Sequence, residues 1–139
     1  MTISGDAMFF PMLAMFLWTF LVMLLNMRVR VRSILRRDLS GRYFELFQGG
    51  TPPETVVKVG NHFHNLMEMP PLFYVVCILI MVMGTSDGLF VILAWIYVGL
   101  RVAHSLVHLT CNFVPLRFSF FFAGTIVLLA MWLRLAWVI

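Results

Sequence analysis

The stretch 57-VKVGNHFHNLMEMPPLFYVV-76 places polar side chains within a strongly apolar part of the chain. Its polar residues crowd into the first part of the stretch: Lys58, Asn61, His62, His64, Asn65 and Glu68. At about 100° per residue, all of them except the two histidines fall on one face of a helix, which the histidines flank. A charged group in hydrocarbon costs at least about 2.5 kcal/mol, so we expect this face to turn toward other helices or a wet cavity.

Four apolar blocks dominate the whole chain. Hydrophobic residues make up 62% of the 139 residues, charged residues make up 12%, and the mean hydropathy is +0.97. A soluble domain is usually about one quarter charged, and each block contains the roughly 20 residues that cross a bilayer as a helix. We therefore predict an all-α integral membrane four-helix bundle, with a single transmembrane domain over 1–139. Its helices are expected at about 7–27, 56–83, 88–109 and 114–138.

The first block is expected to remain in the mature protein as a membrane helix. A secretory signal peptide begins with a positively charged segment. The residues before this block include Asp6 and neither Lys nor Arg. We therefore predict a retained helix rather than a cleaved leader.

Positive charge gathers in the predicted loop 28–55 that follows the first helix. The loop contains six arginines: Arg28, Arg30, Arg32, Arg36, Arg37 and Arg42. Lys and Arg are enriched in cytoplasmic loops, so we expect this loop to be cytoplasmic and both termini to lie on the non-cytoplasmic side. Arg134, near the other end of the fourth helix, is expected to extend to the lipid headgroups. The net charge of +4 and the pI near 9.7 then indicate contact with anionic membrane lipids rather than with nucleic acid.

The third predicted helix carries a polar stripe of its own. Tyr97, Arg101, His104 and His108 are spaced by three or four residues and therefore share one face. Counted from the basic end of the bundle at about 1.5 Å per residue, Glu68 and Arg101 both lie roughly 15 Å deep. Opposite charges at one depth inside a membrane are natural partners, so we predict a structural Glu68–Arg101 ion pair.

Two prolines, Pro70 and Pro71, follow the polar stretch directly. They lack backbone donors and crowd the carbonyls of Leu66 and Met67. We expect a kink that widens the space between helices just past Glu68. A kink that serves packing alone is the alternative explanation.

Polar groups from several helices thus converge on the inner half of the predicted bundle. The set holds one carboxylate, several amides and imidazoles, and the cations Lys58, Arg101 and Arg117. A pocket of this composition suits an anionic, amide-rich small molecule that enters from the cytoplasmic side.

The four histidines allow other interpretations. His104 and His108 are four residues apart and could ligate a metal or haem, with His62 and His64 as further candidates. No third ligand is fixed by spacing, so we expect no metal. Polar side chains in membrane bundles also serve simply as hydrogen bonds between helices.

Two motifs carry a resemblance to a known family. The first is Asn65-x-x-Glu68 followed by proline, and the second is the run 101-RVAHSLVHLTCNFVPLRFS-119, with its Pro-x-Arg ending at Arg117. In these motifs the sequence resembles the MAPEG family, membrane-associated proteins in eicosanoid and glutathione metabolism. The resemblance covers essentially the whole chain and is closest to bacterial members. It implies a homotrimer in the bacterial inner membrane.

The resemblance also implies an activity and a set of site residues. It implies glutathione bound between subunits near the cytoplasmic side and used, by a transferase or peroxidase, on lipophilic electrophiles. Arg117 would be the catalytic residue that stabilises the thiolate, because a thiol with a pKa of about 8.5 needs a nearby cation to ionise at neutral pH. Asn65 and Glu68 would hold the peptide, and Lys58 would meet a carboxylate. A basic position at the end of the first helix corresponds to one of three arginines: Arg28, Arg30 or Arg32. The other polar candidates for glutathione binding are Asn61, Tyr97, His104 and His108.

Three positions depart from the family pattern. Asn61 stands where an arginine is usual, His108 where a glutathione-contacting tyrosine is usual, and Phe118 where a serine can occur. The lost arginine and tyrosine remove contacts worth on the order of 1–3 kcal/mol each, although His108 can replace the tyrosine as a donor. The alternative function is therefore a non-catalytic family member with a polar pocket for a lipid or another small molecule. A haem- or metal-binding bundle is a more distant alternative.

Overall fold

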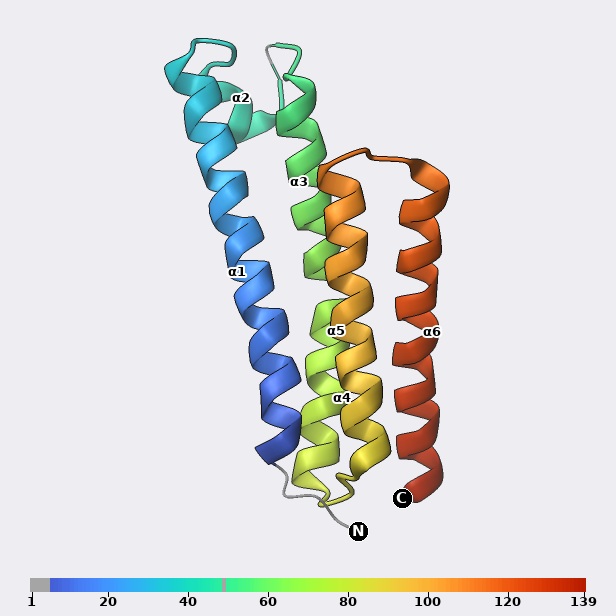
Figure 1. The fold of residues 1–139 in the computed structure, drawn as a ribbon. Coiled ribbons are helices and arrows are strands. Elements are labelled where there is room, and N and C mark those ends of the chain that lie inside the picture. The colour runs from blue at the N-terminus through green and yellow to red at the C-terminus, as the bar shows by residue number, and fades with distance from the viewer. Residues whose placement is uncertain (1–5, 49) are drawn as a thin grey trace.

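The computed structural model describes residues 6–48 and 50–139, whose regular structure is helical. In chain order the helices are α1 (Asp6–Leu35), α2 (Gly41–Leu46), α3 (Glu54–Glu68), α4 (Pro70–Val82), α5 (Gly88–Leu109) and α6 (Val114–Val138). Long rods formed by α1, by α3 with α4, by α5 and by α6 stand side by side, with the short α2 at one end (Figure 1). α1 begins and α6 ends at the opposite end from α2.

Each rod is long and apolar enough to cross a membrane. The four spans are Ala7–Leu35, Glu54–Val82, Gly88–Leu109 and Val114–Val138. Large apolar side chains cover their outward faces; Phe16, Ile92 and Phe122 are all more than half exposed. Such surfaces are unstable in water, so the chain is an integral membrane protein whose outer surface contacts lipid.

α1 continues past the predicted end of the first helix, to Leu35. Arginine is a good helix former, so Arg28, Arg30 and Arg32 extend the helix instead of entering the loop expected over 28–55. The 30 residues of α1 are long enough to reach several turns beyond a hydrocarbon layer of about 30 Å. Accordingly, α1 and α3 extend beyond the α5–α6 connection toward α2 (Figure 1).

A specific C-cap ends α1. Arg37 adopts a left-handed conformation with φ 61°. The Asp38 amide donates to the Ser33 carbonyl at 3.0 Å, and the Arg37 amide donates to the Ile34 carbonyl at 2.9 Å. This Schellman arrangement satisfies carbonyls that the helix end would otherwise leave free, and it turns the chain toward α2.

The second membrane span is divided at Met69. α3 ends at Glu68 and α4 begins at Pro70. Pro70 and Pro71 supply no amide hydrogen to the carbonyls one turn earlier, so the helical ladder is interrupted there. The chain is interrupted where a kink was expected, and the single helix expected over 56–83 is two helices. α5 and α6 coincide with the expected ranges.

At the end of the bundle away from α2, Asp87 joins the start of α5 to α6. Its Oδ1 caps α5 by accepting from the Phe90 amide at 3.0 Å. The two carboxylate oxygens also accept from Nη1 and Nη2 of Arg134 at 2.8 and 2.6 Å. These bonds from Arg134 lower the pKa of Asp87 to about 2. Arg134, which was expected to extend to the headgroups, thus has a bidentate carboxylate partner at this end of the bundle.

The interior changes character along the bundle. Toward the Asp87 end it is apolar, with buried Met8, Phe90 and Met131. Toward α2 it is polar, because the predicted stripe on α5 faces inward: Tyr97, Arg101, His104 and His108 are each at most 5% exposed. The polar stripe therefore forms part of the core.

Candidate active site

Arg117 lies in the first turn of α6, where the chain leaves the α5–α6 connection. Pro115 occupies an early helical position, in which its missing amide costs nothing. Asn112, just before α6, adopts φ 48°, and its Oδ1 accepts from Arg117 Nη1 at 2.8 Å. This bond holds the guanidinium over the end of α5.

A cleft of about 210 Å³ brings Arg117 together with Asn65 of α3 and His104 of α5. Val114, Phe118 and Phe121 complete its lining. The cleft therefore joins a cation, an amide and an imidazole against an aromatic wall. All three polar residues were predicted site residues, and they come from three different helices.

Arg101 lies behind this cleft and is fully buried. Its Nε donates to the Tyr97 hydroxyl at 3.1 Å, and its Nη1 donates to Asn65 Oδ1 at 3.3 Å. The guanidinium also lies 4.8 Å from the centre of the Phe121 ring, a cation–π distance. Nη2 has no hydrogen-bond partner. Arg101 thus fixes Asn65, while its Nη2 stays unsatisfied in the interior.

The expected Glu68–Arg101 ion pair is not formed within the described chain. The Glu68 carboxylate lies 3.4 Å from His64 Nε2, and its side chain is 54% exposed. Equal depth along two helices does not fix the rotation of α3 about its axis, and this rotation leaves Glu68 exposed. Asn65 and Tyr97 take the place of Glu68 as partners of Arg101.

The polar stripe of α3 lies only partly against the rest of the chain, through Lys58 and Asn65. Val59, His62 and Leu66 form the buried face of this helix, whereas Asn61 and Glu68 are exposed. His62, expected only to flank the stripe, is fully buried. The chain therefore leaves Asn61 and Glu68 outside its interior.

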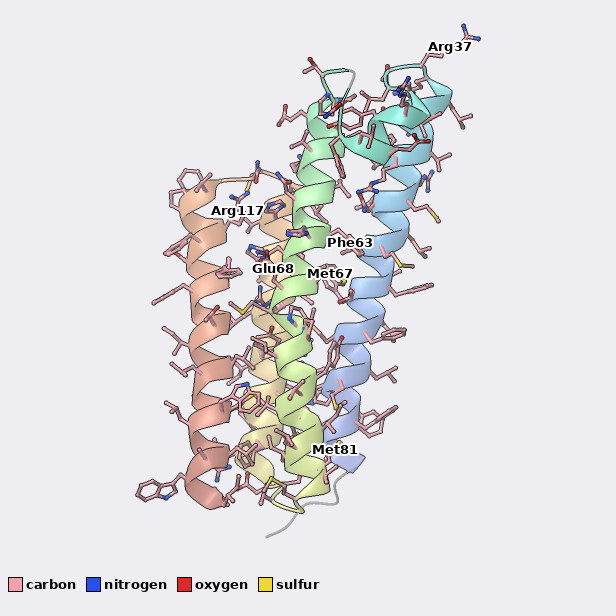
Figure 2. The ribbon with its side chains drawn as sticks, turned by 180° about the vertical axis from the view of Figure 1, so that it is seen from behind. Arg37, Phe63, Met67, Glu68, Met81 and Arg117 are labelled. Carbon is pink, nitrogen blue, oxygen red and sulfur yellow. The ribbon has the colours of Figure 1, made fainter. Side chains whose placement is uncertain are left out.

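A second cavity, of about 500 Å³, opens between α1, α2 and α3. Its polar lining comes from Arg30, Asn61 and His64, and the Arg30 guanidinium lies 5.4 Å from the centre of the Phe44 ring. Figure 2 shows Phe63, which also lines this cavity, on the α1 side of α3, and Arg117 on the α6 side. The predicted binding residues are thus divided between two cavities that α3 separates.

The remaining predicted residues occupy supporting positions. Lys58 Nζ donates to the Thr110 carbonyl at 3.5 Å and links α3 to the end of α5. Tyr97 lies behind the cleft, and its ring stacks on Phe73 with centroids 4.5 Å apart. Arg28 is exposed on α1 and lines neither cavity.

Sequence reasoning did not assign Asn112 and Phe121 to the site. The pattern gives no clue that Asn112 would orient Arg117, although an asparagine at a helix end is typical of a left-handed turn. Phe121 follows Arg117 by one helical turn, and that spacing could have revealed it.

Three histidines form a compact buried group beside the cleft. Ring centroids are 4.9 Å apart for His62 and His108, 5.7 Å for His62 and His104, and 5.8 Å for His104 and His108. His64 is separate from them, with a side chain 80% exposed. Among residues 6–48 and 50–139, no group of three or more His, Cys, Asp or Glu is arranged to hold a metal ion.

The chain matches one known protein family over nearly its whole length. The model of the MAPEG family matches residues 8–137, which is nearly the whole chain. The chain belongs to the MAPEG family. Its four membrane-spanning helices agree with that membership, and MAPEG proteins act in eicosanoid and glutathione metabolism. A comparison with curated proteins gives no match.

Proposed function

We propose that the protein is a glutathione-dependent transferase or peroxidase of the bacterial inner membrane that acts on lipophilic electrophiles. Family membership supports a role related to glutathione or eicosanoid metabolism. The proposal assigns catalysis to Arg117 and the positioning of glutathione to the polar groups around it. The α2 end would be cytoplasmic, where glutathione is available.

The cleft that joins Arg117, Asn65 and His104 carries this proposal. Arg117 is already held by Asn112 at 2.8 Å, so its charge is fixed in position before any ligand binds. A fixed cation in a water-poor site stabilises a thiolate more effectively than one in water. The amide of Asn65 and the imidazole of His104 in the cleft lining add polar groups that suit an anionic, peptide-like ligand.

The arrangement of the two cavities favours a homotrimer. One chain places Arg30, Asn61 and His64 on one side of α3, and Asn65 and Arg117 on the other. A heterologous ring of three copies brings opposite faces of neighbouring chains together. In the proposed trimer, each glutathione site therefore combines one cavity from each neighbour, and Glu68 and Lys58 lie at the same junction.

The electrophile would reach the thiolate from the lipid. Phe118 and Phe121 form the apolar wall of the cleft beside Arg117, and Phe118 is 63% exposed. A lipophilic substrate dissolved in the bilayer meets this wall without crossing water. Arg117 then keeps the sulfur anionic while the electrophile lies against the aromatic rings.

Glutathione binding and conjugation test the proposal directly. We expect glutathione at about 100 times its Kd to stabilise the purified protein by about 2.7 kcal/mol. Arg117→Ala and Glu68→Gln should weaken this effect, and Arg117→Ala should abolish conjugation of a chlorinated nitrobenzene. Arg42→Ala, which removes an exposed arginine of α2, is the matched control and should behave as wild type.

The departures at Asn61, His108 and Phe118 favour a second candidate, a non-catalytic family member. This candidate predicts no thermal shift and no turnover at millimolar glutathione. Binding without turnover would support a ligand-holding role. A Soret band in the purified protein would instead support a haem-binding bundle and contradict both candidates.

A further inference from the structure

The three buried histidines form a continuous group, of which only His104 lines the Arg117 cleft. His62 is 0%, His104 2% and His108 5% exposed. Their ring centroids are 4.9 to 5.8 Å apart. A nitrogen lies only about 1.2 Å from its ring centre by standard geometry, so rings at this spacing are within reach of a direct hydrogen bond or of one bridging water.

The three histidines differ in which ring nitrogens are buried without a hydrogen-bond partner. Both nitrogens of His62 are buried without a partner, whereas for His104 and His108 this holds only for Nδ1. His62 is therefore enclosed, and its neighbours each turn one unpaired nitrogen inward. An unpaired buried polar atom costs free energy. Four such nitrogens in one group therefore call for an explanation.

The two outer histidines reach different surroundings. His104 lines the cleft with Arg117, so its Nε2 is the nitrogen available to that cleft. His108 lies in the last turn of α5, two residues before Thr110, whose carbonyl accepts from Lys58. The group thus leads from the cleft to the end of the bundle nearest α2.

We propose that His104, His62 and His108 form a proton relay that carries the thiol proton of the ligand out of the cleft. This inference rests on the proposed glutathione function. Arg117 and Arg101 stabilise negative charge but accept no proton, so ionisation of the thiol requires another acceptor. A neutral imidazole can accept a proton on one nitrogen and release one from the other.

The proton balance of the relay is simple. The S–H bond breaks, the electron pair stays on sulfur beside Arg117, and the proton binds Nε2 of His104. The Nδ1 proton of His104 passes to His62, and the transfer continues through His108 to water near Thr110. Each imidazole ends neutral, and a tautomer change restores the starting state. The cations near the group, Arg101, Arg117 and Lys58, oppose a proton that remains there.

Stopped-flow mixing of the full-length protein with glutathione tests the relay. The ultraviolet absorbance of the thiolate and a pH-indicator dye in weak buffer report the two products of ionisation. For His62→Phe, which keeps an aromatic ring, we expect both rates to fall at least about tenfold, within the range typical of lost acid–base catalysis. The final thiolate amplitude and the glutathione affinity should stay unchanged.

Further variants separate proton transfer from structure. His62→Gln keeps a hydrogen-bond donor and acceptor but cannot relay a proton, so it should be as slow as His62→Phe. His108→Phe, at the outer end of the relay, should be slow for the same reason. Thr19→Val removes a side-chain hydrogen bond on α1 and should react at the wild-type rate.

The possible outcomes are distinct. Wild-type rates in His62→Phe, or a rate restored by His62→Gln, would overturn the relay and leave the proposed function intact. Absence of any thiolate in the wild-type protein would overturn the proposed function and the relay together. Slow proton release in His62→Phe, His62→Gln and His108→Phe, with an unchanged end point in the two His62 variants, supports the relay.

Discussion

At the scale of single residues, Asn112 connects backbone conformation to the charge in the cleft. Its φ of 48° lies in the left-handed region, which asparagine tolerates better than most residues. Its amide donates to the Val107 carbonyl at 2.8 Å and so closes the end of α5. Its Oδ1 then faces Arg117 at the start of α6. One residue therefore ends a helix and orients the proposed catalytic cation.

Asn112→Gly should lower kcat/KM for conjugation about tenfold, because a hydrogen bond to a charged group contributes about 1.5 kcal/mol. Glycine accepts the left-handed conformation, so the turn itself should persist. Steady-state kinetics with varied glutathione measure the change. Ser119→Ala, which removes a hydrogen bond to the Pro115 carbonyl in the same helix, is the control and should keep wild-type activity. Equal activity in Asn112→Gly would show that Arg117 needs no support from Asn112.

Tyr97→Phe should lower the free energy of unfolding by about 2 kcal/mol, because it leaves a buried donor of Arg101 unpaired. The stacking on Phe73 is retained in this variant. Glu68→Gln should change stability by no more than about 0.5 kcal/mol, since Glu68 forms only an exposed pair with His64. Thermal unfolding in detergent measures both effects. The reverse order of effects would restore Glu68 as the main partner of Arg101.

At the scale of helices, side-chain hydrogen bonds link neighbouring helices at both ends of the bundle. Lys58 joins α3 to the end of α5 near α2. At the other end, Asp87 caps α5 and binds Arg134 of α6 through two hydrogen bonds. Between them, the second membrane span is interrupted at Met69, between α3 and α4. The cleft therefore lies between helices that are fixed relative to one another.

Asp87→Ala should lower the free energy of unfolding by about 2 kcal/mol, with about 1 kcal/mol each from the lost helix cap and the lost bidentate pair. Asp87→Asn keeps the cap and should lose only about half as much. Thermal unfolding of the two variants against wild type measures the difference. If both variants matched wild type, the contacts of Asp87 would contribute nothing to stability.

The contribution of the Asp87–Arg134 pair should also depend on pH. The pKa of Asp87 is about 2 in the folded protein and about 3.9 for an unperturbed aspartate. A lowered pKa stabilises the fold fully above the unfolded value, and this stabilisation is lost as the pH falls toward the folded value. The stability difference between wild type and Asp87→Asn should therefore be constant above about pH 5 and shrink between about pH 4 and pH 2. A difference that persists unchanged at pH 2 would contradict this assignment.

At the scale of the whole molecule, α3 divides the expected binding residues between two cavities. Arg30 and Asn61 line one, and Asn65 and Arg117 line the other. Helix α3 itself lies between them, so the two groups cannot close on one ligand within a chain. The proposed trimer resolves this division by pairing unlike cavities of neighbouring chains.

Mixed trimers should therefore recover activity that neither variant has alone. Arg30→Ala and Arg117→Ala chains, each inactive or nearly so, would be co-expressed in equal amounts. If each site takes one cavity from each of two neighbours, about one quarter of the sites in random mixtures hold both intact cavities. Conjugation near that fraction of wild type supports the shared site. No recovery in verified mixed trimers would place the whole site within one chain.

The sequence determined more of the fold than of the candidate site. Hydropathy fixed the four membrane spans, because each must satisfy its backbone internally and present apolar side chains to lipid. The proline pair predicted a kink just past Glu68, where α3 ends and α4 follows. The end of α1 was missed, since arginines suit a helix that leaves the membrane as well as they suit a loop.

Tertiary structure decided which way the polar stripes face. Spacing places residues such as Asn65 and Glu68 on one helix face, but rotation about the helix axis depends on packing against every neighbour. That rotation buried His62, gave Asn65 to Arg101 and turned Glu68 outward. The sequence by itself therefore determined the membrane bundle and the family motifs. Only the packing of α3 against α1 and α5 decided which polar groups share the Arg117 cleft.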